Sequence, residues 1–177
     1  GPLTVYDEVS LELSRKAWVT WKDMGVLDNW GDGTITRDVI DTMVGEHGRG
    51  GRHHGGGFYE YGEDGSKAIW PGLMDLYFNA DASVAEDDMK DRLLFRQVIE
   101  ALKCLETNVL RTVADGNIGS IMGIGAPAWT GGLIQFVNTY GLERFSARCA
   151  ELANQYGDRF DAPAIVGEKI AAGETFA

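Results

Sequence analysis

The sequence contains few cysteine, histidine and proline residues and has fewer basic than acidic ones. Among 177 residues it has two cysteines, three histidines and four prolines, and 16 basic residues against 27 acidic ones, for a formal net charge of −11. Duplex nucleic acids are bound through a basic face, so this balance argues against nucleic-acid binding. Cys104 and Cys149 form neither a CxxC pair nor a disulfide framework.

Long hydrophobic runs and a leader-like segment are also lacking. The longest apolar runs fall far short of the ~20 residues that span a bilayer, and no basic segment followed by an apolar one opens the chain. The chain is 44% hydrophobic, which is enough to bury a core in one domain or in two small ones. We therefore expect a soluble, cytoplasmic protein without a transmembrane segment.

All three histidines lie in one glycine-rich stretch that begins at His47. Neighbouring side chains of an extended segment point in opposite directions, so His53 and His54 cannot easily share a metal ion, and no cysteine completes a ligand set. The glycine spacing does not fit GxGxxG either. Glycine permits positive φ angles just before the β-prone run Phe58–Tyr61. We expect a solvated loop that leads into a short extended arm, with no metal bound.

Two further motifs imitate binding sites. "DNWGDGTITRDV", from Asp28, has the aspartates and glycine of a calcium loop, but Trp30 occupies position 3 and Val39 replaces the bidentate glutamate at position 12. "GIGAPA", from Gly123, matches GxGxxA, yet it follows a predicted helix and contains Pro127, so the strand-to-helix context is missing. We expect a plain turn at the first and no dinucleotide site at the second.

The spacing of apolar residues predicts a mostly helical chain. Leu3 to Trp21 fits one amphipathic helix, and Thr36 is placed to N-cap a short second one. The segment "NADASVAEDD" (79–88) is typical of a linker. Cys149 fits core packing better than nucleophilic chemistry, because no histidine is near it in sequence. Helices are also expected at residues 71–78, 88–110, 145–156 and 164–172, with a glycine-punctuated bend at 116–136; Phe58–Tyr61 is the only convincing strand.

The sequence also contains an internal repeat. "GPLTVYDEVSLE" is parallel to "GGLIQFVNTYGLE" if one residue is inserted, which pairs Leu3 with Leu133 and Asp7 with Asn138. Further on, "DVIDTMVGEHGRG" before Phe58 is parallel to "PAIVGEKIAAGET" before Phe176. Two copies of one helical unit are therefore predicted, at residues 1–79 and 80–177.

The first copy begins at the point that corresponds to the end of the bend in the second. We therefore expect the first copy to be incomplete, with the chain a fragment that is cut inside this copy. The alternative is that Gly1-Pro2 is a cleavage scar. The missing first helix should leave an apolar groove lined by the Leu3–Val9 turn. We expect a second polypeptide carrying that helix, in preference to a dimer partner, to fill the groove.

Several motifs in order resemble one enzyme family. "GPLTVYDEVSLE", "GGGFYEY", "RLLFRQVIEALKCLE", "DGNIGSIMGIGAPAWTGGLIQFV" and "GDRFDAPAIVGEKIAAGETF" are similar to the C-terminal helical region of 3-hydroxyacyl-CoA dehydrogenase. The closest resemblance is to the multifunctional fatty-acid β-oxidation enzymes of the trifunctional type. The resemblance implies an all-α fold of two duplicated helical units, the first one incomplete. In the family, single-copy enzymes dimerise through this helical domain, and the multifunctional enzymes resemble that dimer fused into one chain.

The resemblance implies few site residues for this chain. The family's catalytic histidine, glutamate and serine, together with its NAD-binding motif, lie in a preceding domain, and its catalytic asparagine lies on the helix before the "GP" motif. No catalytic residue, metal ligand or NAD contact is therefore expected here. Pro2, Leu3 and Tyr6 match the stretch that borders the acyl-CoA substrate. The structural bend of the second copy is matched by Gly125, Pro127, Gly131 and Gly132. Departures from the family are Ala126 in place of an aromatic and Asn117 and Asn138 in place of aspartate.

Two functions from different classes follow. By resemblance, the parent enzyme oxidises 3-hydroxyacyl-CoA to 3-ketoacyl-CoA with NAD, and it carries an enoyl-CoA hydratase as well. Its implied partners are an acyl-CoA substrate, the upstream NAD-binding domain, and either a homo-oligomer or a thiolase-containing complex. The alternative is a non-catalytic helical dimerisation or interaction module. An upstream coding region with an NAD domain that ends in an asparagine-bearing helix would favour the first function.

Overall fold

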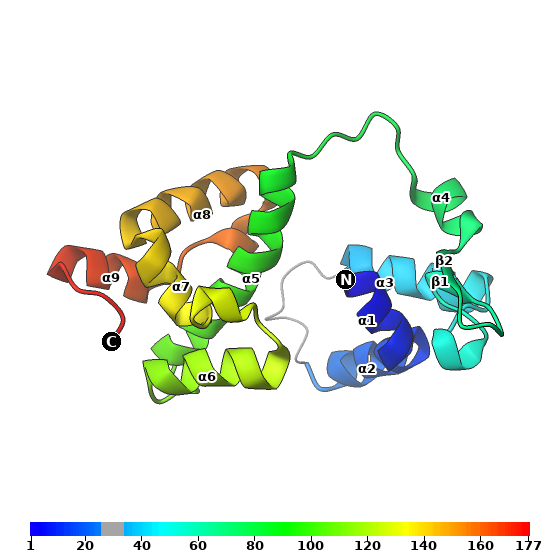
Figure 1. Ribbon diagram of the computed structural model, residues 1–177, viewed down its shortest axis with the longest axis horizontal. Coiled ribbons are helices and arrows are strands. Elements are labelled where there is room, and N and C mark those ends of the chain that lie inside the picture. Colours follow the sequence, from blue (N-terminus) through cyan, green and yellow to red (C-terminus); the bar gives the residue numbers. More distant parts are fainter. Residues whose placement is uncertain (26–33) are drawn as a thin grey trace. The chain divides into compact units, whose positions relative to one another are not determined.

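A computed structural model of the chain describes residues 1–25 and 34–177 (Figure 1). The chain divides into two compact units, residues 1–82 and 83–177. Nearly all regular structure of the described residues is helical, beside one small sheet of two strands. The predicted all-α class is therefore confirmed.

Unit 1 is a set of short helices with one antiparallel hairpin. Its core is made of Leu11, Ile40, Met43 and Phe58. In the hairpin Tyr59 pairs with Ile69. The elements, in order, are α1 (Pro2–Val9), α2 (Leu11–Asp23), α3 (Thr34–Asp41), a π-helix (Thr42–Glu46), a 3₁₀ turn (Arg52–His54), β1 (Tyr59–Tyr61), β2 (Lys67–Ile69) and α4 (Pro71–Tyr77).

The single helix predicted over Leu3–Trp21 is wrong, because the chain breaks at Ser10. Ser10 has a φ of 86°, between α1 and α2. Its hydroxyl donates to the Gly50 carbonyl at 3.0 Å, and Gly51 lies so close that a Cβ there would meet the Asp7 carbonyl oxygen. Apolar periodicity could not reveal the break, since it does not record the backbone angle at a single residue such as Ser10.

Two smaller expectations in unit 1 need correction. Thr36 does not cap a helix, since α3 already begins at Thr34. The extended arm is not alone, because the polar segment after Tyr61 turns back and pairs as β2. The helix expected at residues 71–78 is present as α4, which begins at Pro71.

Unit 2 is a helical bundle around one continuous core (Figure 1). Helix α5 buries Phe95, Val98, Ile99 and Leu102 and packs along α7. The helix at residues 164–172 lies where the sequence predicts it. The elements are α5 (Glu86–Glu106), α6 (Val113–Ile124), a 3₁₀ turn (Ala128–Thr130), α7 (Leu133–Tyr140), α8 (Leu142–Tyr156), a 3₁₀ turn (Asp158–Phe160) and α9 (Ala164–Ala172).

The bend predicted over residues 116–136 is shorter than expected, because its first half forms α6. Thr112 caps this helix by accepting the Asp115 amide at 3.0 Å. Gly116 faces α7 so closely that a Cβ would overlap the Ile134 side chain. The glycine that disfavours a helix in isolation is therefore needed here for close helix packing.

The pairs α1–α2 and α7–α8 have the same local geometry. Ser10 has φ 86° and ψ 122°, and Gly141 has φ 90° and ψ 124°. Both N–H groups bond the carbonyl four residues before, at 2.9 Å. Helices α1 and α7 each have eight residues, so the structures align without the inserted residue, and Leu3 corresponds to Ile134 in place of Leu133.

A long-range hydrogen bond is repeated in the two units. In unit 1 the Asp7 carboxylate accepts the Phe58 amide at 2.7 Å, and in unit 2 the Asn138 side-chain oxygen accepts the Phe176 amide at 3.0 Å. Both phenylalanines are buried. The pairing of Asp7 with Asn138 and of Phe58 with Phe176, first inferred from sequence, thus corresponds to equivalent contacts.

The π-helix explains a length difference between the units. Buried Ile40 lies eight residues before Gly48, whereas buried Val166 lies seven before Gly173, and both glycines have a φ of 66°. The wider turn of a π-helix accommodates one extra residue. The ungapped alignment of this segment is therefore out of register by one residue before the π-helix at Thr42–Glu46.

Candidate functional site

An apolar surface of unit 1 lies along α1 and α3. A cavity of about 360 Å³ is lined by Leu3, Tyr6, Val39 and their neighbours on α3 and α4, and by Phe58 just before β1. Elsewhere on α1, Val5 and Val9 are 60% and 52% exposed, although both are apolar. We call Leu3, Val5, Tyr6, Val9, Ile35 and Val39 the open face of unit 1.

The three residues that the resemblance places beside the substrate lie on or next to the open face. Leu3 and Tyr6 line its cavity and are half-buried, while Pro2 is exposed in the first turn of α1. Tyr6 also contacts Phe58 edge to face, with ring centroids 6.3 Å apart. The lining is almost wholly apolar, so this surface suits a hydrocarbon chain or an apolar helix and offers no acid or base.

A buried carboxylate holds the region behind the open face. Asp7 is fully buried, and it accepts hydrogen bonds from the Phe58 amide, from the Tyr59 amide at 2.9 Å and from the Tyr61 hydroxyl at 3.0 Å. Burial, which is the largest cause, and the hydrogen bond to Asp7 together raise the pKa of Tyr61 to about 12. Because all of its partners are structural donors within unit 1, Asp7 fixes the hairpin against α1.

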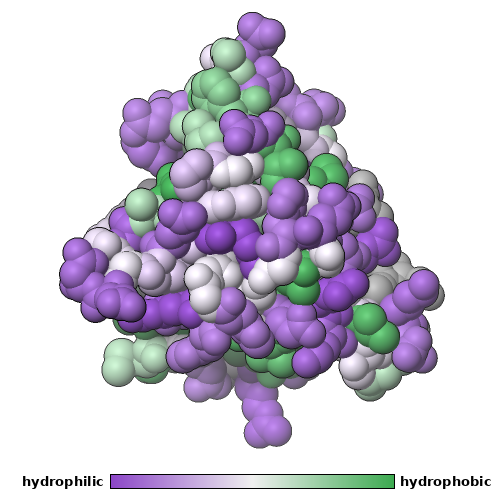
Figure 2. Space-filling view, turned by 90° about the vertical axis from the view of Figure 1, so that its right-hand side faces the viewer, coloured by the Kyte–Doolittle hydropathy of each residue, from purple (hydrophilic) through white to green (hydrophobic). Residues whose placement is uncertain are grey.

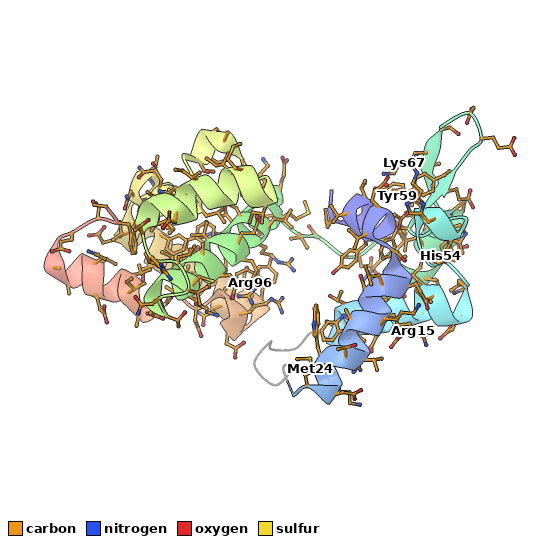
Figure 3. All side chains as sticks on the ribbon, turned by 90° about the horizontal axis from the view of Figure 1, so that it is seen from below. Arg15, Met24, His54, Tyr59, Lys67 and Arg96 are labelled. Atoms are coloured by element: carbon orange, nitrogen blue, oxygen red, sulfur yellow. The ribbon has the colours of Figure 1, made fainter. Side chains whose placement is uncertain are left out.

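The glycine-rich loop is held together by internal contacts. The Arg49 guanidinium donates to the carbonyls of Gly57 and Tyr59 at 2.6 and 2.9 Å, and Lys67 lies 3.9 Å from the Tyr59 ring centroid (Figure 3). His53 and His54 are exposed in a 3₁₀ turn. Among the described residues, no three His, Cys, Asp or Glu side chains are grouped to hold a metal ion.

The hairpin and the segment from α4 to Phe78 expose some apolar side chains, since Ile69, Met74 and Phe78 are 48%, 48% and 65% exposed. Figure 2 shows a face made mainly of hydrophilic residues, with hydrophobic ones scattered among them. The first half of the calcium-like sequence, including Asp28 and Trp30, lies outside the described residues. Its end is described, and there Val39 belongs to the apolar wall of the cavity.

The four bend residues shape the connection between α6 and α7. Gly125 ends α6, Pro127 precedes the 3₁₀ turn, and Gly131 ends that turn with a φ of 73°. Gly132 has a φ of 109°, and a Cβ there would overlap the Asn117 backbone. Asn117 uses this proximity, because its side-chain oxygen accepts the amides of Ile134 and Gln135, at 3.1 and 2.9 Å, and thereby caps α7.

Unit 2 contains a second apolar cavity but no nucleophilic centre. The cavity measures about 470 Å³ and lies between α5 and α6, with Cys104 on its wall. Cys149 is buried elsewhere in the core, and burial raises the pKa of its thiol to about 12. Residues 83–177 contain no histidine, so neither thiol has an imidazole base within its own unit.

Comparison with known proteins identifies relatives of this chain. No protein-family model matches the chain. Fatty acid oxidation complex subunit alpha of Vibrio campbellii is 32% identical over 164 residues, covering 90% of the chain and 22% of the relative. The same subunit of Vibrio parahaemolyticus gives equal values, and that of Shewanella frigidimarina is 32% identical over 179 residues, covering 97% and 24%. The chain is a homologue of part of these alpha subunits.

The alpha-subunit homology confirms the resemblance that the motifs indicated. A match over 90% of the chain includes most of both helical units. The chain spans less than a quarter of the length of these alpha subunits. Among the described residues, no helix is long and apolar enough to cross a membrane.

Proposed function

We propose that the chain is the C-terminal part of an NAD-dependent 3-hydroxyacyl-CoA dehydrogenase of fatty-acid β-oxidation. The observation that carries the proposal is the homology with fatty acid oxidation complex alpha subunits over 90% of the chain. The two helical units with equivalent Asp7–Phe58 and Asn138–Phe176 contacts support it. The parent enzyme would also carry an enoyl-CoA hydratase and work as a homo-oligomer or in a complex with a thiolase.

The residues described do not fit NAD binding by themselves. Their one sheet is a two-stranded antiparallel hairpin, whereas a dinucleotide site needs parallel strands that lead into helices. The glycines near Gly123 end α6 instead of opening a helix after a strand. NAD, which accepts hydride when bound, therefore belongs to another domain of the parent.

The role proposed for this chain is substrate-side packing. Pro2, Leu3 and Tyr6 are assigned to the border of the acyl-CoA site, and their apolar neighbours would exclude water from that border. A general base must lie within hydrogen-bonding reach of the proton it removes, and the apolar open face supplies none. The chain alone is therefore proposed to be inactive, with its contribution made through packing and contacts between domains or subunits.

The test compares the longer polypeptide that contains this chain with residues 1–177 alone. Acetoacetyl-CoA reduction is followed by the loss of NADH absorbance at equal molar concentrations. We expect turnover by the longer polypeptide and none by residues 1–177. Absence of turnover by a folded longer polypeptide would overturn the proposal in favour of a non-catalytic helical interaction module. Turnover that copurifies with residues 1–177 would overturn the assignment of the catalytic groups to another domain.

A further inference from the structure

One pocket of unit 2 gathers three arginines, although the chain carries a formal net charge of −11. The pocket measures about 430 Å³ and is formed by the first half of α5 and the 3₁₀ turn at Asp158–Phe160. Among the described residues, no aspartate or glutamate lines it. Guanidinium charges gathered in one pocket attract anions. We call this the arginine pocket, and its lining residues are Met89, Arg92, Leu93, Arg96, Arg159 and Phe160.

Contacts within unit 2 hold the three arginines in place. Arg96, labelled in Figure 3, donates from its guanidinium group to the Arg159 carbonyl at 3.0 Å. The Arg92 guanidinium lies 4.2 Å from the centroid of the Tyr156 ring. That of Arg159 lies 5.3 Å from the centroid of the Phe160 ring. The positive charges of the pocket are therefore positioned by the fold.

Two of the three arginines have donors to spare. Among the described residues, only Arg96 has a carboxylate within 4.0 Å, that of Glu100 at 2.6 Å. Asp88 lies one helical turn before Arg92, but it is already paired with Arg148. The other two guanidinium groups of the pocket are thus available to an anion. Such groups bind carboxylates and phosphates through two parallel hydrogen bonds.

The arginine pocket adjoins the apolar cavity between α5 and α6, because Arg96 lines both. From Arg96 the cavity extends along α5 to Cys104, a length of about 12 Å at the rise of an α-helix. Its volume of about 470 Å³ is within the range of about 300–1,000 Å³ that is typical of small-molecule sites. The wall is almost wholly apolar and includes Ala101, Val109, Leu110, Ile124 and Leu133.

Two carboxylates give the combined site a direction. Glu100 and Asp115 also line the apolar cavity, so this cavity repels an anionic headgroup while its apolar wall accepts a hydrocarbon chain. The arginine pocket carries the opposite charge. A ligand with a chain at one end and a negative charge at the other therefore fits in one orientation only.

We propose that unit 2 binds an amphiphilic anion with a single hydrocarbon chain. The chain lies in the cavity between α5 and α6, and the carboxylate or phosphate headgroup binds to Arg92 and Arg159. The proposal rests on the adjacency of the two parts, since a neutral apolar molecule would use only the cavity and an inorganic anion only the arginine pocket. This site has no part in the proposed function, and the inference does not depend on that function.

Calorimetric titration of the 177-residue chain tests both parts of the site. The probes are decanoate and decyl phosphate, each below its micelle concentration, together with decanol, which lacks the charge, and inorganic phosphate, which lacks the chain. We expect one-to-one binding of at least one of the two amphiphilic anions, and the tighter one identifies the headgroup. Decanol and inorganic phosphate should bind at least about tenfold more weakly.

Three results of the titration would overturn the proposal. The first is that neither decanoate nor decyl phosphate binds. The second is that decanol or inorganic phosphate binds as tightly as the amphiphilic anions, because one part of the site would then contribute nothing. The third is binding to phosphatidylglycerol vesicles without binding of either soluble anion, which would assign the surface to a membrane.

Arginine variants locate the headgroup. The double variant Arg92→Gln/Arg159→Gln should weaken binding of the anion at least about tenfold and leave that of decanol unchanged, because only the headgroup loses its charged donors. Arg144→Gln is the matched control, since Arg144 is also exposed and lies 5.1 Å from a ring centroid, that of Tyr140. If circular dichroism shows that the double variant does not fold, Arg159→Gln is used alone. Equal affinities of the pocket variant and the control for the anion would refute the assignment.

Glycine variants of α6 locate the hydrocarbon chain. Gly119 lines the cavity and has open space at its Cβ position, so the side chain of Gly119→Leu would occupy the cavity. Gly123→Leu is the control, because Gly123 also has open space but is not part of the lining. Leucine favours a helix more than glycine does, so both variants should fold. We expect at least about tenfold weaker binding by Gly119→Leu only, and equal binding by the two variants would contradict the placement of the chain.

The natural thiol on the cavity wall reports the bound chain directly. Cys104 is half-buried in the cavity lining, whereas Cys149 is fully buried elsewhere in the core. Alkylation of Cys104 by iodoacetamide is followed by mass spectrometry. A saturating amphiphilic anion should slow it at least about tenfold, and inorganic phosphate should not. An unchanged rate with the bound anion would show that the chain does not lie in this cavity and would overturn the proposal.

Discussion

Replacing the buried carboxylate of unit 1 by an amide should destabilise that unit strongly. The two oxygens of Asp7 accept three donors, the amides of Phe58 and Tyr59 and the hydroxyl of Tyr61. In Asp7→Asn one oxygen becomes an NH2 group. The Tyr61 hydroxyl can rotate and accept from it, but the backbone amide of Tyr59 then faces another donor.

The size of the effect follows from the hydrogen bonds lost. One hydrogen bond to a charged group contributes about 1.5–3 kcal/mol, and a buried donor left without a partner costs about 1–3 kcal/mol. We therefore expect Asp7→Asn to lower the free energy of unfolding by about 2–3 kcal/mol, and Asp7→Ala by about 4 kcal/mol or more. At ~0.05–0.15 kcal/mol per residue, an 82-residue unit has only about 4–12 kcal/mol in total.

Urea unfolding followed by tryptophan fluorescence measures this effect. Four of the five tryptophans belong to unit 1, and Trp129 of unit 2 is 75% exposed and should change little. The unfolding midpoint of Asp7→Asn should fall by about 1–2 M urea. Asp38→Asn is the matched control, because it removes the same charge from a side chain that is 67% exposed. If the two variants unfold within about 0.5 kcal/mol of each other, the structural role of Asp7 is refuted.

Three further perturbations have defined outcomes. Because the pKa of Tyr61 is raised to about 12, its contribution to stability is complete below the ordinary tyrosine pKa of ~10 and is lost as the pH rises through 12; absorbance at 295 nm during alkaline titration should show this late tyrosine. Hydrogen bonds from Arg148 and, to a smaller extent, from Tyr156 lower the pKa of Asp88. This carboxylate therefore stabilises unit 2 above pH ~4 and stabilises it less as the pH falls further. Between pH 6 and 2.5 the melting temperature should fall less for Arg148→Met than for the unaltered chain. Gly57→Ala should destabilise unit 1 because its Cβ would overlap the Asp7 carboxylate, whereas Gly167→Ala, with open space at the Cβ, should not; melting temperatures of the two variants compare them directly.

Helical periodicity predicted the elements whose apolar stripes face a core. Helix α9 was placed at its observed bounds, and α5 was displaced by only a few residues, because Leu94, Val98 and Leu102 repeat at helical spacing. Such a pattern records which side of a segment is buried. It does not record where the backbone turns, and therefore it joined α1 to α2 across Ser10.

Tertiary contacts decided the features that local sequence could not. The glycines of α6 disfavour a helix locally, but Gly116 lets Ile134 of α7 pack against the helix. Strand β2 has no buried side chain, so no alternation of apolar residues was available to predict it. The apolar groove at Leu3 and Tyr6 was predictable because it depends on the repeat, while its walls at Val39 and Leu73 became evident only from the structure.

The exchange of aspartate for asparagine between the units follows from what each side chain meets. Asp7 meets only donors, because the hairpin of unit 1 presents two amides and the Tyr61 hydroxyl to it. Asn138 makes two hydrogen bonds to the backbone of one residue. Its oxygen accepts the Phe176 amide, and its NH2 group donates to the Phe176 carbonyl at 2.7 Å. A carboxylate could accept the first but not donate the second, and it would repel the carbonyl oxygen. An asparagine at this position therefore fits the amide and the carbonyl of Phe176 together.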